Sequence, residues 1–496
     1  MSTTFDIVEA TIDEAQSAIR SGDLTAADLV AAYLERIEAI DKSGPTLNSV
    51  ITINPAAMAE AEALDEEFKR TGAFKGPLHG VTVLVKDQVE TKDIMTTFGS
   101  IAQDGYMPEK DATAITQLKA QGAIILGKTA LPDFATSWFG ICSKIGSTKN
   151  PYVLSRDPGG SSSGTAASVA ASLAMVGIGE DTGGSIRLPA SFCNLVGVRV
   201  TPGLISRDGM SPLVVFQDTA GPMARTVKDA ALLLDGMVGY DPNDEYTVAA
   251  LIANHKGSYA DAIDTDSMSG ARLGVVRNAF GDGTAGDSGE VNAVVEEALG
   301  KLEAAGATLV DLEIPDLMDH IIATSLYDSH SRHDINKFLA SRPDMPTKSL
   351  EAIKEQELFH PNLDLLKGIF EGPEHPEDDP DYFRKMAARD TFQRLVVNLM
   401  AKNEVDALVF PTVQLLSPTK AEVFADKYQV LTYPTNTLIA AQTWLPSIAM
   451  PAGFSKEGVP VGVELVVKPF AEDELFRLGA GFEQAVGARQ APSFKE

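Results

Sequence analysis

The sequence predicts one α/β domain that spans the whole chain. Apolar segments of strand length alternate with segments whose apolar residues recur at helical spacing, which is typical of a layered α/β architecture. No internal repeats, low-complexity tracts or linkers interrupt the 496 residues. Hydrophobic residues make up 44% of the chain, enough to fill a sizeable core. A chain of this length has room for several domains, but nothing in the pattern marks a boundary between them.

The first 70 residues are predicted to be helical. Ile12, Ala15 and Ile19 recur at helical spacing, and Thr25 is placed to cap a second helix. The further predicted helices cover 111–121, 165–172, 290–305 and most of 319–366. Strands are predicted where short apolar runs stand between the helices, at 81–86, 124–127, 173–179, 273–276, 407–410, 446–450 and 458–465.

The chain is strongly acidic, with a net charge of −28 from 69 acidic and 41 basic residues. A field of this sign repels phosphate backbones and anionic membrane surfaces, so we expect neither nucleic acid nor membrane as a partner. Solubility is the simplest interpretation of the charge, and a salt-rich habitat is the alternative. The sequence has no apolar run of about 18 residues and no signal peptide at its start. We therefore expect a cytoplasmic protein.

The sequence contains no pattern that indicates a metal or cofactor site. Cys142 and Cys193 are the two cysteines, too few for a disulfide framework or a zinc site. The chain also lacks a ligand cluster and a phosphate-binding loop. No metal and no organic cofactor are expected.

Ser185 is a candidate nucleophile. The segment 181–187 reads Asp-Thr-Gly-Gly-Ser-Ile-Arg, with two glycines before the serine at a turn from strand to helix. Such a turn exposes backbone N–H groups beside the hydroxyl, as an oxyanion hole requires. Glycine keeps the approach of a carbonyl group free. An isolated Gly-Gly-Ser is more often a flexible turn.

A serine hydroxyl needs a base before it becomes a nucleophile. None of the seven histidines stands in a sequence context that marks it as that base. Lys86 directly follows an apolar strand, and burial there would lower its pKa far enough for a neutral amine to accept a proton. On its own, a lysine at a strand end more often reaches solvent.

Residues 160–164, Gly-Ser-Ser-Ser-Gly, match the G-x-S-x-G nucleophile elbow, with Ser162 as the nucleophile. That motif requires a strand immediately before it. The preceding residues 150–158 contain two prolines and no apolar run. We therefore reject the elbow.

The lysine strand 76–87, the glycine–serine loop 159–167 and the segment 179–190 together closely resemble the amidase signature family. The interval between Ser161 and Ser185 is the one that the family keeps between its bridging serine and its nucleophile. The resemblance covers nearly the whole chain and is weakest from 280 to 400. It continues through 197–206, 218–226, 447–454 and 458–465.

The resemblance implies a Ser-Ser-Lys triad. Ser185 would attack the carbonyl group, and Ser161, after a cis peptide bond, would bridge Ser185 and Lys86. Neutral Lys86 would take up the proton and return it to the leaving amine.

The resemblance also implies the groups around the triad. Arg187 resembles an arginine that braces the loops without touching substrate. Ser163 and Glu180 depart from the family pattern, in which glycine and a small polar residue are usual, and neither is expected to contact the triad. The oxyanion would be held by the backbone N–H groups of Thr182, Gly183, Gly184 and Ser185.

The fold implied is a large, twisted, mixed sheet sandwiched by helices in a single domain, 1–496, with its core motifs in 76–230. Residues 315–400 are a candidate substrate-facing cap. Residues 327–341 look like peptide-amidase-like members, which suggests an amidase acting on simple linear amides, with esters and carbamates as side activities. The alternative is the amidase subunit of a tRNA-dependent glutamine amidotransferase. We expect a small-molecule amide substrate and a monomer or homodimer.

The motifs do not supply the walls of a substrate pocket. Two apolar segments outside them, 134–142 and 443–446, contain both tryptophans of the chain. Phe134, Trp138 and Trp444 are therefore candidate substrate-binding residues, and a role as core aromatics is the alternative.

Overall fold

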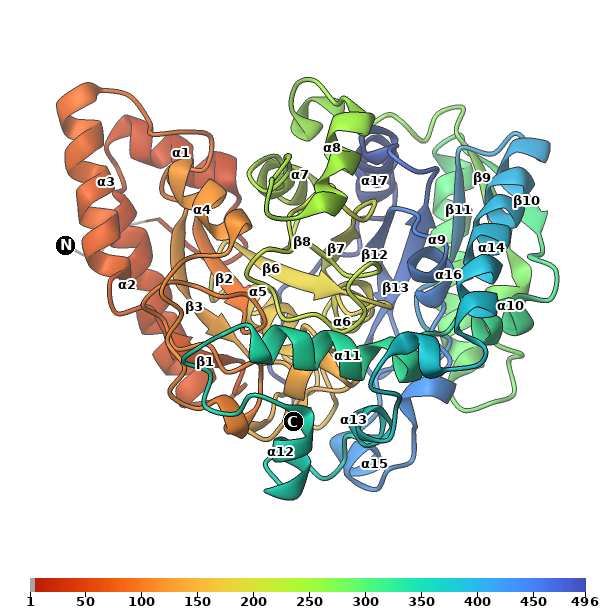
Figure 1. Cartoon of the computed structure of the whole chain (residues 1–496). Coiled ribbons are helices and arrows are strands. Elements are labelled where there is room, and N and C mark those ends of the chain that lie inside the picture. Colours follow the sequence, from red (N-terminus) through yellow and green to blue (C-terminus); the bar gives the residue numbers. More distant parts are fainter. Residues whose placement is uncertain (1–4) are drawn as a thin grey trace.

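A mixed sheet of 11 strands runs through the computed structural model, which describes residues 5–496 (Figure 1). The predicted α/β class with a large mixed sheet is confirmed. The strand order is β1-β3-β2-β6-β8-β7-β12-β13-β11-β9-β10, and β4 and β5 form a separate small ribbon. The strands are β1 Val50–Ile53, β2 Thr82–Lys86, β3 Ile124–Thr129, β4 Ile141–Cys142, β5 Gly146–Ser147, β6 Val176–Asp181, β7 Val196–Arg199, β8 Thr219–Ala224, β9 Arg272–Val276, β10 Thr308–Leu312, β11 Ala407–Pro411, β12 Ser447–Phe454 and β13 Pro460–Val466.

The sheet consists of two parallel blocks joined by antiparallel strands. Strands β3, β2 and β6 are parallel to one another, as are β11, β9 and β10. The strands between the two blocks pair in antiparallel fashion. Because β2 and β6 are parallel neighbours, their carboxyl ends meet at the same edge of the sheet, where α/β enzymes usually place their sites.

Seventeen α-helices surround the sheet in the described part of the chain, and none is long and apolar enough to cross a membrane. They are α1 Ile12–Ser21, α2 Ala26–Arg36, α3 Ala57–Thr71, α4 Thr113–Ala120, α5 Ser163–Ala170, α6 Arg187–Phe192, α7 Val227–Asp235, α8 Val248–Ala253, α9 Ser288–Ala304, α10 Leu317–Ala323, α11 Tyr327–Ala340, α12 Leu350–Glu355, α13 Asp364–Phe370, α14 Tyr382–Lys402, α15 Lys420–Phe424, α16 Leu438–Gln442 and α17 Glu472–Val486.

Helices cover both faces of the sheet, as the alternating side chains of β11 show. Ala407 and Val409 pack in the cluster that holds residues of α7, α9 and α17. Leu408 and Phe410 pack in the cluster that holds residues of α10, α14 and α16. Ala449 of β12 lies on the same face as Phe410 and packs with α5 and α6. The helices that carry the site loops therefore share one face with α14.

The expectation that the first 70 residues are entirely helical was wrong. Residues Val50–Ile53 form β1, which pairs antiparallel with β3 at the sheet edge. Gly127 of β3 allows this pairing, because a Cβ atom there would lie 2.2 Å from the carbonyl oxygen of Thr52. The run Val-Ile-Thr-Ile has the β-branched composition of a strand but is too short to show a clear period.

The other predicted elements are present, with shifted bounds. The strand expected over 173–179 is β6, and the one expected over 458–465 is β13, which forms a hairpin with β12. The long helical stretch 319–366 divides into α10, α11, α12 and the start of α13. In Figure 1, α11 crosses in front of the sheet.

Candidate active site

Lys86 is the last residue of β2, at the edge where β2 and β6 end. Its side chain is 0% exposed. Its Nζ lies 2.8 Å from Ser161 Oγ and 3.0 Å from the carbonyl oxygen of Glu180. Burial lowers the pKa of the Lys86 ammonium below its ordinary value, because water no longer solvates the charge. The fold therefore buries this amine in contact with one serine hydroxyl and one backbone carbonyl group.

Ser161 lies in the loop before α5, and its peptide bond with Gly160 is cis. The backbone N–H of the next residue, Ser162, donates to the carbonyl oxygen of Ser185 at 3.0 Å, which fastens the two serine loops together. Gly164 lets α5 approach the end of β3, because a Cβ atom there would lie 2.2 Å from a backbone nitrogen. The loop is therefore held by close backbone packing as well as by hydrogen bonds.

Ser162 does not occupy a nucleophile elbow. The residues before it form turns and isolated bridges, with no strand leading into the serine. Its side chain is fully buried. Its Oγ lies 3.3 Å from both the backbone oxygen and the backbone nitrogen of Glu180. The local structure thus gives Ser162 a role in packing the loop against β6.

The turn that carries Ser185 has no room for larger residues at its two glycines. A Cβ atom at Gly183 would lie 2.0 Å from the hydroxyl oxygen of Tyr327. Gly184 has a φ of +152°, and a Cβ atom there would lie 2.0 Å from Thr437 Oγ1. Both residues must be glycine for the turn to keep this shape.

The backbone N–H groups at the turn are free to bind a ligand. Within residues 5–496, those of Thr182, Gly183, Gly184 and Ser185 donate no hydrogen bond. The Ser185 side chain is 3% exposed. In the same part of the chain, no hydrogen bond joins its Oγ to Ser161 Oγ. The structure thus brings Lys86 and Ser161 into direct contact and leaves Ser185 on the neighbouring loop.

Arg187 braces the turn from below through a buried ion network. Its guanidinium group donates to both carboxylate oxygens of Asp181, at 3.0 and 3.1 Å, to Glu464 of β13 and to the carbonyl oxygen of Thr437 at 2.8 Å. Arg199 of β7 also pairs with Asp181, at 2.9 Å. Although burial opposes ionisation, the two arginines hold the pKa of Asp181 at about 2. Arg187 is fully buried and serves to fix the loops.

The expectation that Glu180 stays away from the triad was wrong. Its Oε2 lies 3.3 Å from Lys86 Nζ, and both side chains are buried. Ser163, the other departure from the family pattern, hydrogen-bonds to the carbonyl oxygen of Ala130, and within residues 5–496 it forms no hydrogen bond with Lys86, Ser161 or Ser185. The sequence could not reveal the first contact, because it depends on how two neighbouring strands end.

A small cavity of about 10 Å³ lies beside Ser185. Such a volume is comparable to that of one water molecule. Trp138 is one wall of it, held by a 2.8 Å hydrogen bond from its Nε1 to the carbonyl oxygen of Val430. The remaining walls are Ala135, Ser137, Leu213, Tyr327, Leu365 and Val430.

Phe134 and Trp444 do not line this cavity. Phe134 is fully buried and stacks on Phe98, with ring centroids 6.3 Å apart. Trp444 packs edge-on against Phe216, below the guanidinium group of Arg389. Of the three aromatic candidates, the structure places only Trp138 in the cavity with Ser185.

Tyr327 is a site residue that the motifs did not single out. It begins α11, lines the cavity beside Ser185, and its buried hydroxyl has no hydrogen-bond partner in the described chain. Burial raises its pKa, so the hydroxyl keeps its proton and can donate it in a hydrogen bond. Its place at the head of a helix after an irregular stretch gives no periodic signal.

Residues 5–496 contain no group of three or more His, Cys, Asp or Glu side chains suited to hold a metal ion.

Comparisons with known proteins decide the family. The family model described as Amidase matches residues 28–476. The chain belongs to the amidase signature family. A probable amidase of Arabidopsis thaliana is 34% identical over 100% of this chain and 93% of its own length. A glutamyl-tRNA(Gln) amidotransferase subunit of Microcystis aeruginosa is 34% identical over 95% of this chain and 96% of its own.

Among solved structures, the native peptide amidase of Stenotrophomonas maltophilia matches with a TM-score of 0.86 and 32% identity, over 98% of this chain and 99% of that one. This match supports the peptide-amidase-like subgroup predicted from residues 327–341. The protein is thus an amide-hydrolysing enzyme, and the Ser-Ser-Lys triad is characteristic of its family.

The ion network of this amidase generates a stability prediction. Arg187→Met leaves Asp181 and Glu464 buried with fewer cations, so we expect the free energy of unfolding to fall by about 3–5 kcal/mol in urea. Arg394→Met is the matched control, because Arg394 is exposed and pairs only across one helical turn. It should change stability by less than about 0.5 kcal/mol. An Arg187→Met protein as stable as the wild type would show that the network does not brace the loops.

Proposed function

We propose that the amidase cleaves the C–N bond of a small linear amide through an acyl-enzyme on Ser185, with Ser161 and neutral Lys86 relaying protons. The observation that carries the proposal is the 2.8 Å contact between Lys86 Nζ and Ser161 Oγ at a fully buried site. A lysine in water is protonated at neutral pH and cannot act as a base. Burial disfavours the charged form and makes the amine available.

The relay conserves protons over each half-reaction. As Ser185 Oγ attacks the carbonyl carbon, its proton passes to Ser161 Oγ, which gives its own proton to Lys86 Nζ. The lysine returns a proton by the same route to the leaving nitrogen, the C–N bond breaks and the amine departs. Water then takes the place of the amine and releases the acid. Hydrogen bonds of this kind often tighten only with substrate in place, which fits the open Ser161–Ser185 contact.

The free backbone N–H groups of Thr182, Gly183, Gly184 and Ser185 support an oxyanion hole. The charge that develops on the carbonyl oxygen during the attack needs donors that are already aligned. The two glycines hold these donors in place because no larger residue fits there.

The cavity beside Ser185 supports an apolar binding site for one side of the substrate. Trp138 and Leu213 form part of its wall, and Tyr327 and Leu365 come from α11 and α13. We infer that residues 315–400 act as a substrate-facing cap, since two of these walls belong to that segment. We propose a C-terminal peptide amide or an aryl amide as the substrate, with esters and carbamates as side activities. These walls must move to admit it, because the cavity as it stands holds about one water molecule.

The alternative is the amidase subunit of a tRNA-dependent glutamine amidotransferase. The 34% identity with the amidotransferase subunit of Microcystis aeruginosa favours it, while the net charge of −28 opposes a role beside tRNA. We favour a cytoplasmic monomer or homodimer without a nucleic-acid or membrane partner. Assays of the purified protein against amides, esters, carbamates and glutamine distinguish the two, because a preference for glutamine would support the amidotransferase role.

Covalent labelling tests the nucleophile. A fluorophosphonate should modify Ser185, because its hydroxyl lies beside free oxyanion donors and the lysine relay. Mass spectrometry of the digested protein should place the adduct on the peptide that contains Ser185, and Ser185→Ala should abolish it. Ser162→Ala is the control and should still be labelled. An adduct on Ser162 would restore the elbow that we reject.

Replacement of the base tests the relay. Lys86→Ala should lower kcat for amide hydrolysis by at least about 10²–10⁴-fold, since a general base is lost. Alanine at His330, which is also buried, is the matched control and should cost far less. In the wild type, activity should fall as pH drops through the pKa of Lys86, because only the neutral amine accepts a proton. A His330→Ala protein as inactive as Lys86→Ala would contradict the triad.

The tryptophans test the pocket. Trp138→Ala enlarges the cavity beside Ser185 and should change the ranking of substrates by size, by about 1–3 kcal/mol in kcat/KM discrimination. Trp444→Ala is the control, because Trp444 packs away from the cavity and should lower the Tm without changing the ranking. If both variants rank the substrates as the wild type does, specificity must come from residues 315–400 instead of the tryptophans.

A further inference from the structure

Glu180 connects the catalytic lysine to a second carboxyl group. Its Oε2 lies 3.3 Å from Lys86 Nζ, and its Oε1 lies 3.2 Å from Thr182 Oγ1. Thr182 Oγ1 in turn lies 2.6 Å from Asp218 Oδ1. All four side chains are at least 97% buried. They form a continuous chain of polar contacts that leads away from Ser161.

Lys86 is the one cation paired with these two carboxyl groups in the described chain. Asp181, next to Glu180, has its own partners in Arg187 and Arg199. Asp87, next to Lys86, pairs with Lys128 at 3.4 Å. Glu180 forms an ion pair with Lys86 alone, and Asp218 forms none, being held by Thr182 and by the backbone N–H groups of Leu213 and Val214.

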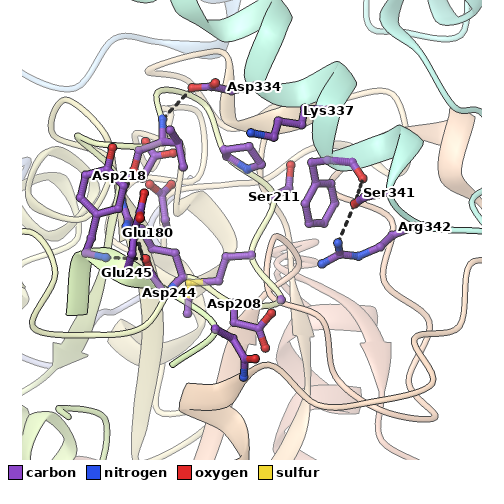
Figure 2. A pocket seen from close by; sticks show the side chains of 18 of the residues that line it. Glu180, Asp208, Ser211, Asp218, Asp244, Glu245, Asp334, Lys337, Ser341 and Arg342 are labelled. Carbon is purple, nitrogen blue, oxygen red and sulfur yellow. Dashed lines mark hydrogen bonds and ion pairs between the residues drawn. The ribbon is translucent and has the colours of Figure 1, made fainter. Parts of the chain in front are cut away.

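The Asp218 end of these polar contacts borders an open cavity of about 610 Å³, which is different from the small cavity beside Ser185. Figure 2 shows Glu180 and Asp218 on one side of this cavity and Lys337 and Arg342 on the other. Its acidic lining residues are Glu180, Asp208, Asp218, Asp244, Glu245 and Asp334. The cavity is large enough for water, and Glu180 and Asp218 are among its lining residues, so water in it can exchange protons with these two carboxyl groups.

We propose that Glu180 is a positioning residue that sets the pH at which Lys86 becomes a base, with Thr182 and Asp218 linking the pair to the acidic cavity. The inference rests on the proposed function, since it concerns the same lysine. Ionised Glu180 stabilises the ammonium form of Lys86 through its charge and its hydrogen bond. Lys86 then becomes neutral only at a higher pH than burial alone would require.

The proton balance of this step is simple. On activation, the Lys86 ammonium loses one proton to the Glu180 carboxylate, which gives a neutral amine and a carboxylic acid. The acid releases this proton to water in the cavity and becomes a carboxylate again. A complete turnover leaves the number of protons on Lys86 unchanged. The polar contacts through Glu180, Thr182 and Asp218 therefore set the protonation state of the resting lysine.

The test is the rate of fluorophosphonate labelling of Ser185 as a function of pH. Glu180→Gln keeps the shape of the side chain and removes its charge. We therefore expect the acid limb, the low-pH part of the profile in which labelling slows, to move to lower pH. An opposite charge at this distance typically shifts a pKa by about 1–3 units. Burial and the neighbouring Glu180 raise the pKa of Asp218 well above its ordinary value. Asp218→Asn therefore removes only the charge that this carboxyl carries at the upper end of the pH range, and should move the limb in the same direction by less. Glu245→Gln, in the same cavity but outside the chain of contacts, should leave it unchanged.

The outcomes separate this inference from the proposed function. If the wild type is not labelled at Ser185 at any pH, the proposed function fails. If labelling is normal but Glu180→Gln leaves the acid limb in place, or moves it to higher pH, the inference alone is wrong. A loss of Tm without a shifted limb would give Glu180 a merely structural role. If Glu180→Gln does not fold, the pH profile of Asp218→Asn decides between the outcomes. An acid limb at the same pH as in the wild type then overturns the inference.

Discussion

The exclusion of water from one lysine is the constraint on which the rest of the site depends. Lys86 can serve as a base only if its charged form is poorly solvated, and the fold achieves this by placing it between two parallel strand ends. The surrounding small residues follow from that requirement. Gly164, Gly183 and Gly184 occupy positions where a side chain would collide with a neighbour, and this lets the backbone pack closely around the buried lysine.

The same burial creates a problem of charge, because several carboxyl groups share the lysine's surroundings. Asp181 is kept ionised by Arg187 and Arg199, and it anchors the turn that carries Ser185. Glu180 has no such arginine and contacts the lysine itself. Two adjacent residues of β6 thus have different partners: Asp181 is paired with arginines of the scaffold, and Glu180 is paired with Lys86.

Sequence patterns captured the fold class, most strands and the family, because apolar runs and short motifs are local features. A lysine at the end of an apolar strand or a serine after two glycines is ambiguous alone, and their combination with the glycine–serine loop 159–167 indicates the family. What the sequence could not supply depends on tertiary packing. Phe134 and Trp444 both have positive φ, 52° and 55°, so the chain turns there and periodicity does not show where the side chains point. Tyr327 reaches Ser185 only because α11 crosses the sheet.

The hairpin of β12 and β13 occupies the middle of the sheet although it is made last. It joins the parallel block that holds Lys86 to the block of β9, β10 and β11, and it supplies Glu464 to Arg187. During synthesis on the ribosome, the ion network below the turn that carries Ser185 is therefore incomplete until the C-terminal strands have been made. Until then the nascent chain exposes the unpaired edges of β7 and β11. At this stage of synthesis the chain is therefore most prone to aggregate.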